Sequence, residues 1–203
     1  MPEQTGIKPH SFSTRLNNLF WETYLGISTR GIVDVNHPDS YHYATMSYAT
    51  IRRVLDFLSL KKDDIFTDIG CGKGRVLCLA ARYRPGKVIG VDLSKEFCET
   101  ARSNANRMRG SHSPIVIYNS DAESFDYSEG TVFLLFNPFG ATTLNMVLSK
   151  IHSDGKGKSV RIAYANPVHD EVFAHHPWLR PYERWEKERL NMEHSIYFYH
   201  SNV

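Results

Sequence analysis

The stretch of the chain best suited to chemistry begins at Asp68, where an acidic side chain precedes three alternating glycines, Gly70, Gly72 and Gly74. A short apolar run leads into this stretch and an apolar-periodic segment follows it, so the pattern predicts strand, tight turn and helix. Glycine permits a positive φ and lets a ligand lie against bare backbone. The first turn of the following helix would direct its free N–H groups to the same place. We expect a small-molecule site here, at the carboxyl end of a parallel strand.

Three nucleotide-binding interpretations compete for this loop. A P-loop needs Ser or Thr after Gly-Lys, but Gly74 follows Lys73, so that interpretation is rejected. A dinucleotide fingerprint needs a third glycine where this chain has Arg75, which disfavours a dinucleotide-dependent oxidoreductase. A carboxylate before the glycines would repel a pyrophosphate, but it suits a ligand that carries an amino group and a sulfonium. A chance cluster of glycines in a loop is the remaining alternative.

The pattern Asp-x-Gly-x-Gly-x-Gly resembles the first motif of the class I, seven-strand S-adenosylmethionine-dependent methyltransferases. The resemblance implies S-adenosyl-L-methionine as cofactor and S-adenosyl-L-homocysteine as product. About twenty residues later Asp92 ends the next predicted strand, where a carboxylate can accept hydrogen bonds from a ribose diol. A cap of the following helix is the alternative role for Asp92. The residues that we expect to bind the cofactor are Asp68, Gly70, Cys71, Gly72, Gly74, Asp92, Leu93, Asp121, Ala122, Asn137, Tyr43 and Thr45.

Two of these assignments rest on the resemblance more than on the residues themselves. Asp121 and Ala122 stand where the family places a polar side chain and a backbone N–H against the adenine, although Asp-rich loops are also ordinary turns. The aromatic segment 41–48 precedes a predicted helix, as do segments that fold over the cofactor in the family. Tyr43 and Thr45 could contact the methionine carboxylate or form a lid, and simple packing of this loop is an equal alternative.

The tripeptide Asn137-Pro138-Phe139 follows a predicted strand without a break. It resembles the Asn/Asp-Pro-Pro-Tyr/Phe motif of amino-methylating family members, shortened by one proline, which weakens the inference of an adenine or glutamine substrate. By that resemblance we expect Asn137 and the Pro138 carbonyl to orient an acceptor nitrogen. An aromatic face such as that of Phe139 can stabilise the developing cation. An Asn-Pro turn followed by a core phenylalanine is the alternative.

The remaining candidate residues give weaker indications of function. Cys71 lies between glycines with no identifiable base, so we do not expect a nucleophile there. We expect Lys73 and Arg75 on an exposed first helical turn, although Arg75 could meet an acidic group. The histidines show no metal-ligand spacing supported by cysteines, so no metal is expected.

These features predict direct transfer of a methyl group to a nucleophile, most simply the nitrogen of a protein side chain or of a small molecule. The protein would mainly align two reactants and exclude water. No general base can be assigned. A catalytically inactive S-adenosylmethionine-binding scaffold or regulatory protein is the alternative function. Duplex nucleic acid is an improbable acceptor because no target-recognition domain or strong basic patch is evident.

Composition sets outer bounds on the type of protein. With 203 residues the chain fits one domain with its own core. The formal charge of +2 is too small to argue for nucleic acid or a membrane. No apolar run is long enough to span a bilayer and no secretory signal is visible. Three cysteines without a Cys-x-x-Cys pair favour a reducing, cytoplasmic location.

Strand and helix patterns alternate through most of the chain, which predicts a parallel sheet covered on both faces. The expected fold is α/β and Rossmann-like: a three-layer sandwich with a mostly parallel seven-stranded sheet, an antiparallel C-terminal hairpin and an N-terminal helical cover. We expect an N-terminal extension or lid over 1–64 and a cofactor-binding domain over 65–203. The predicted strands are 65–69, 87–91, 115–118, 131–136, 159–165, 182–189 and 195–200, and the predicted helices are 15–25, 47–60, 73–83, 94–108, 141–151 and 168–175.

Overall fold

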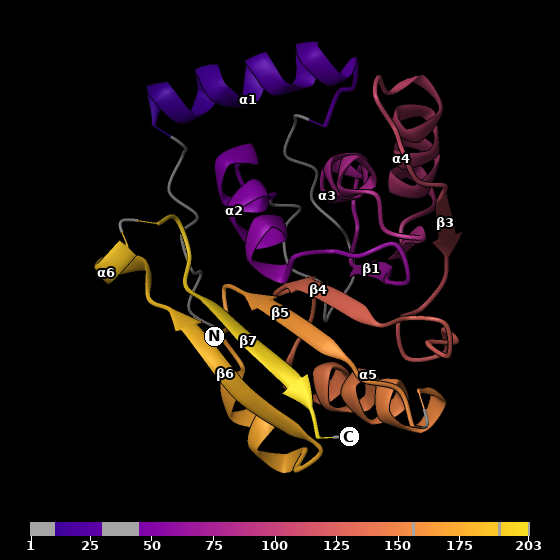
Figure 1. Cartoon of the computed structure of the whole chain (residues 1–203), viewed down its shortest axis with the longest axis vertical. Coiled ribbons are helices and arrows are strands. Elements are labelled where there is room, and N and C mark those ends of the chain that lie inside the picture. The colour runs from indigo at the N-terminus through magenta and orange to yellow at the C-terminus, as the bar shows by residue number, and fades with distance from the viewer. Residues whose placement is uncertain (1–10, 30–44, 156, 191, 203) are drawn as a thin grey trace.

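A single seven-stranded sheet organises the computed structural model, which describes residues 11–29, 45–155, 157–190 and 192–202 (Figure 1). The strand order is β3-β2-β1-β4-β5-β7-β6, and all neighbours are parallel except the pairs that β7 makes with β5 and β6. This topology confirms the predicted fold class. The strands are β1 (Ile65–Ile69), β2 (Lys87–Asp92), β3 (Ile115–Asn119), β4 (Val132–Phe136), β5 (Arg161–Ala165), β6 (Leu179–Trp185) and β7 (Ile196–Ser201).

Helices cover both faces of the sheet, each through its own apolar cluster. One cluster joins the sheet to α2, α3 and α4, and the other joins its opposite face to α5 and η2. Because both faces are covered, the central strand β4 reads as an almost continuous apolar run, as parallel strands do. The helices are α1 (Phe12–Leu25), α2 (Tyr48–Leu58), α3 (Arg75–Ala80), η1 (Ala81–Tyr83), α4 (Lys95–Arg107), α5 (Ala141–Asp154), η2 (Asp170–His175) and α6 (Lys187–Leu190).

The C-terminal hairpin differs from its prediction. The predicted strand 182–189 ends at Trp185, and the next residues form the short helix α6 within the connection to β7. The run from Glu186 to Arg189 is charged and lacks strand alternation, and its residues favour a helix. The Lys187 N–H donates to the Ser195 hydroxyl at 3.1 Å, which holds the turn against the start of β7.

Helix α1 is joined to α3 by buried polar contacts. Arg75, expected on an exposed turn, is only 3% exposed, and this prediction was wrong. Its guanidinium forms an ion pair with Glu22 of α1 at 3.1 Å, and it also donates to the Thr29 hydroxyl and the Met46 carbonyl. The stated alternative, that Arg75 meets an acidic group, is therefore confirmed.

A buried amide makes a second connection to the glycine turn. Asn104 of α4 donates from one nitrogen to the carbonyls of Ser28 and Lys73, and its oxygen accepts from the Ser28 N–H. This side chain ties the segment after α1 to the turn before α3. None of the helices in the described parts of the chain is long and apolar enough to cross a membrane.

Candidate active site

The glycine turn between β1 and α3 has the backbone geometry that its sequence predicts. Gly70 has φ +80° and Gly74 has φ +81°, both in the left-handed region that favours glycine. The N–H groups of Gly70 and Cys71 donate to the Val91 carbonyl of β2 at 2.9 and 3.1 Å, which draws the turn over the neighbouring strand. A Cβ added at Gly70 would lie 2.7 Å from the Cβ of Pro138, so the turn and the loop after β4 touch at this point.

Asp68 lies beneath this turn as a buried carboxylate. Among the described residues none donates a hydrogen bond to it. Burial first, and the charge of Asp92 second, raise the pKa of Asp68 to about 8. A buried carboxylate without a donor is costly unless a cation approaches it. This arrangement fits the predicted role of Asp68 toward the amino group of S-adenosylmethionine.

Asp92 closes β2 and already has two backbone partners. One carboxylate oxygen accepts from the Gly72 N–H and the other from the Ser94 N–H, each at 2.8 Å. Burial raises the pKa of Asp92, and these two hydrogen bonds partly offset the effect. The carboxylate therefore holds the glycine turn against the start of α4, where Ser94 is the N-cap residue. Each oxygen keeps a second lone pair, so the predicted contact with a ribose remains compatible with this bonding.

The predicted adenine side of the site lies at the ends of β2 and β3. Leu93 exposes about half of its side chain directly after Asp92. Asp121 is exposed, and one of its carboxylate oxygens accepts from the Glu123 N–H at 2.9 Å, which is an ordinary turn contact. Ala122 is half-buried next to this turn. The structure places these residues along one edge of the sheet, as expected.

Asn137 follows β4 at the same edge, opposite the glycine turn. It is buried and has φ +38°, an uncommon value for a residue before proline. Its side-chain oxygen accepts a hydrogen bond from the Tyr164 hydroxyl of β5 at 3.1 Å. The sequence alone does not indicate this hydrogen bond, because the bond depends on the register in which β4 and β5 pair.

A second asparagine with the same backbone geometry lies at the end of the neighbouring strand. Asn166 has φ +51°, precedes Pro167, and donates its N–H to the Ser195 carbonyl at 2.9 Å. The ends of β4 and β5 are adjacent, since Phe136 pairs with Ala165. Sequence reasoning did not single out Asn166, although the repeated Asn-Pro after two successive parallel strands was a usable signal.

Phe139 is buried in the apolar cluster beneath α5, together with Leu135 and Leu144. This placement agrees with the alternative of a core phenylalanine after an Asn-Pro turn. Thr45 is half-buried just before α2, while Tyr43 lies outside the described residues.

Cys71 lies in the turn as a buried thiol. Burial, followed by the charges of Asp68 and Asp92, holds its pKa well above the ordinary value, so the thiolate is disfavoured. No group of three or more potential metal ligands occurs within the described ranges.

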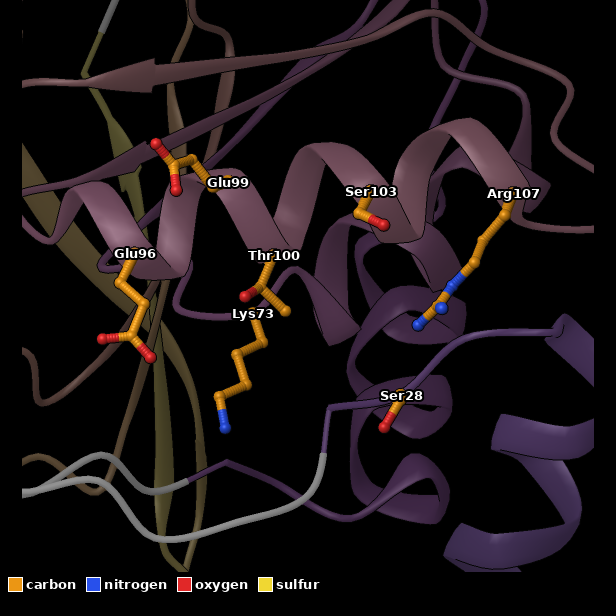
Figure 2. A pocket seen from close by; sticks show the side chains of 7 residues that line it. All are labelled: Ser28, Lys73, Glu96, Glu99, Thr100, Ser103 and Arg107. Carbon is orange, nitrogen blue, oxygen red and sulfur yellow. The ribbon is translucent and has the colours of Figure 1, made fainter.

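A polar hollow of about 450 Å³ lies beside the glycine turn, on the outer surface of α4 (Figure 2). None of the described residues predicted to hold the cofactor lines it. We therefore treat it as distinct from the candidate site. Its lining residues are Ser28, Lys73, Glu96, Glu99, Thr100, Ser103 and Arg107.

Comparisons with known proteins place similar sequences among methyltransferases. A family described as "Methyltransferase domain" matches residues 66–153. The chain is 28% identical over 159 residues to a protein-lysine N-methyltransferase of Saccharolobus islandicus (strain REY15A), which covers 77% of this chain and 91% of that protein.

Two further similarities are more limited. A ribosomal protein L11 methyltransferase of Paraburkholderia phymatum is 29% identical over 116 residues, covering 56% of this chain and 38% of that protein. A crystal structure of an RNA methyltransferase from Salinibacter ruber in complex with S-adenosyl-L-homocysteine has a TM-score of 0.53 at 18% identity. The match covers 78% of this chain and 94% of that chain, and it shows likeness of fold.

Proposed function

This chain belongs to the class I S-adenosylmethionine-dependent methyltransferases, and we propose that its methyl acceptor is the side-chain nitrogen of a lysine in a protein. The similarity to the protein-lysine enzyme supports this proposal because it spans most of both chains. The L11 relative, which also acts on a protein by its name, supports the same class of acceptor.

S-adenosylmethionine supplies a methyl group that its sulfonium makes electrophilic. In our proposal Asp68 holds the amino group, Asp92 the ribose hydroxyls, and the loop of Asp121 and Ala122 the adenine, while Leu93 offers apolar contact. Tyr43 and Thr45 remain predicted contacts of the methionine part, whereas Asn137, also expected among the cofactor contacts, acts in our proposal on the acceptor alone. The bare backbone of the glycine turn lets the cofactor approach closely. Methyl transfer disperses the positive charge of the sulfonium in the transition state, and this favours a site from which water is excluded.

The observation that carries the acceptor assignment is the buried oxygen of Asn137, next to the loop that touches the glycine turn. A neutral lysine amine has two N–H donors and one lone pair. If Asn137 Oδ1 and the Pro138 carbonyl each accept a hydrogen bond from one N–H of the amine, the amine lone pair is left to face the methyl group. The hydrogen bond from Tyr164 occupies one lone pair of Asn137 Oδ1 and leaves the other for the amine.

The test is transfer of a radiolabelled methyl group from S-adenosylmethionine to two separate acceptor pools. One pool contains unmethylated proteins freed of nucleic acid and small molecules, and the other contains the small-molecule fraction. We expect label in the protein pool, and we expect peptide mass spectrometry to place it on lysine. The Asn137→Ala variant should lose most turnover and keep its cofactor affinity, whereas Asn106→Ala, at an exposed position of α4, should match the wild type.

Label confined to the small-molecule pool, or to residues other than lysine, would contradict the proposed acceptor. Cofactor binding without any transfer would instead favour the scaffold function. The two failures are separable because affinity and transfer are measured on the same protein samples.

A further inference from the structure

Helix α1 has its apolar face turned away from the protein. A surface helix ordinarily buries its apolar stripe and exposes its polar face. In α1 the polar side chains of Asn18 and Glu22 are 5% and 2% exposed, whereas Phe12 and Phe20 are 77% and 60% exposed. Figure 1 shows α1 as the outermost element on its side of the molecule. The exposed stripe consists of Phe12, Leu16, Leu19, Phe20 and Tyr24.

Buried polar partners fix this orientation. Glu22 pairs with Arg75 and accepts from the Thr29 N–H and hydroxyl. Asn18 accepts from the Tyr48 N–H at 3.1 Å. Rotating α1 to bury its stripe would break these contacts and leave the Arg75 charge buried and unpaired, which is strongly unfavourable. The exposed stripe is therefore a stable feature of the folded chain.

The stripe is large enough to form an interface. From the exposed fractions, its five side chains present on the order of 500 Å² of surface. A patch of this size is at the upper end of what monomeric proteins leave uncovered. Two such stripes packed against each other would bury about 1,000 Å², the lower limit for a specific protein–protein contact.

The chemistry of the stripe favours a second copy of the same chain. The five side chains of the stripe are uncharged, and Arg15 and Asn17 flank it on α1. At one end of the stripe Arg82 lies over the Tyr24 ring. A helix that binds a membrane surface usually has several basic residues on its polar face, whereas α1 has one basic residue, Arg15. A long, uncharged stripe is complementary to itself when two copies pair around a two-fold axis. We propose that the outer face of α1 is a homodimer interface.

The test compares the masses of three proteins by sedimentation equilibrium at concentrations up to roughly 100 µM. Wild type should approach twice the mass of one chain. The double variant Leu16→Glu/Phe20→Glu should have half the wild-type mass, because it sets like charges against each other across the two-fold axis. The matched control Thr142→Glu/Met146→Glu adds the same charges at the same spacing on exposed positions of α5 and should remain a dimer.

Both variants should keep the circular dichroism spectrum and cofactor affinity of the wild type, because the altered residues face solvent in one chain. A monomeric wild type would overturn the proposal. A dimer that survives the double substitution would also overturn it, since the interface would then lie elsewhere. If the wild type were monomeric and floated with anionic vesicles only when the stripe was intact, the stripe would be a membrane contact and not a dimer interface. If the wild type were monomeric and removal of residues 1–10 exposed the stripe to surface labelling, the stripe would be covered within one chain and the dimer proposal would be wrong.

Discussion

The Tyr164 hydroxyl donates a hydrogen bond of 3.1 Å to the side-chain oxygen of Asn137, joining the carboxyl ends of β5 and β4. The same hydroxyl accepts from the His169 N–H at 3.3 Å. Tyr164 therefore connects the asparagine proposed to hold the acceptor with the chain that leaves β5. The bond holds the side chain of Asn137 at the edge of the sheet.

Tyr164→Phe removes this bond and keeps the buried ring. We expect a five- to tenfold lower turnover number, because the net value of one neutral hydrogen bond is about 1 kcal/mol. Cofactor affinity measured by calorimetry should not change, as Tyr164 lies on the acceptor side. Tyr182→Phe on the exposed edge strand β6 is the control and should leave both quantities unchanged. An equal loss of affinity and turnover would show that Tyr164 supports the whole site and not the asparagine alone.

Asp68 makes the stability of the ligand-free protein depend on pH. Its pKa is raised to about 8 in the folded protein and is ~3.9 when unfolded, so between these values the folded state binds a proton that the unfolded chain releases. The free energy of unfolding should therefore fall as pH rises from about 4 to about 8, by at most about 1.4 kcal/mol per pH unit from this group.

Asp68→Asn should remove that contribution, as measured by urea unfolding at several pH values without cofactor. Asp126→Asn is the control, because the pKa of this exposed carboxyl is lowered and it stays ionised throughout the window. Identical pH slopes for wild type and Asp68→Asn would contradict the raised pKa of Asp68.

Gly70→Ala tests the contact between the glycine turn and the loop of Asn137. The added Cβ would meet Pro138 at 2.7 Å and would also sit at a positive φ, so we expect destabilisation of ~1–3 kcal/mol and much weaker cofactor binding. Gly157→Ala is a matched control, since Gly157 has φ +74° with nothing within 4 Å of the added atom. That variant should show the strain of the backbone alone, with cofactor affinity as in the wild type.

The buried ion pair of Glu22 and Arg75 should be strongly coupled. Arg75→Met leaves the Glu22 carboxylate buried without its cation and should lower the free energy of unfolding by ~3–5 kcal/mol. The double variant Arg75→Met/Glu22→Met should recover part of that loss. Breaking the exposed pair of Lys95 and Glu99 by Lys95→Met should cost less than ~1 kcal/mol. If the losses in free energy of unfolding of Arg75→Met and Glu22→Met simply added up in the double variant, the coupling would be excluded.

The strands and the glycine turn could be predicted because their signals are local. The bounds 65–69 match β1 without change, and the predicted strand 87–91 extends in β2 to Asp92. Ser94 caps α4 through its hydroxyl, which accepts from the Phe97 N–H at 3.3 Å, and a serine just before an apolar-periodic run is a local signal for such a cap. In each case the residue types and the next few positions determine the structure.

The remaining features depend on partners distant in the sequence. Arg75 was expected on an exposed first helical turn, yet Glu22, fifty-three residues earlier, pairs with it. The apolar spacing of Leu16, Leu19 and Phe20 correctly predicted a helix, but it could not reveal that this face would lie outward. The bond from Tyr164 to Asn137 required the register of two neighbouring strands.

The most direct test of the account measures cofactor affinity by calorimetry and single-turnover methyl transfer to a lysine-containing protein, for wild type and Asn137→Ala. We predict equal affinities for S-adenosylmethionine and a transfer rate at least about tenfold lower in the variant, as for loss of a group that acts mainly in the transition state. Equal transfer rates, or a wild type that binds no S-adenosylmethionine, would contradict the account.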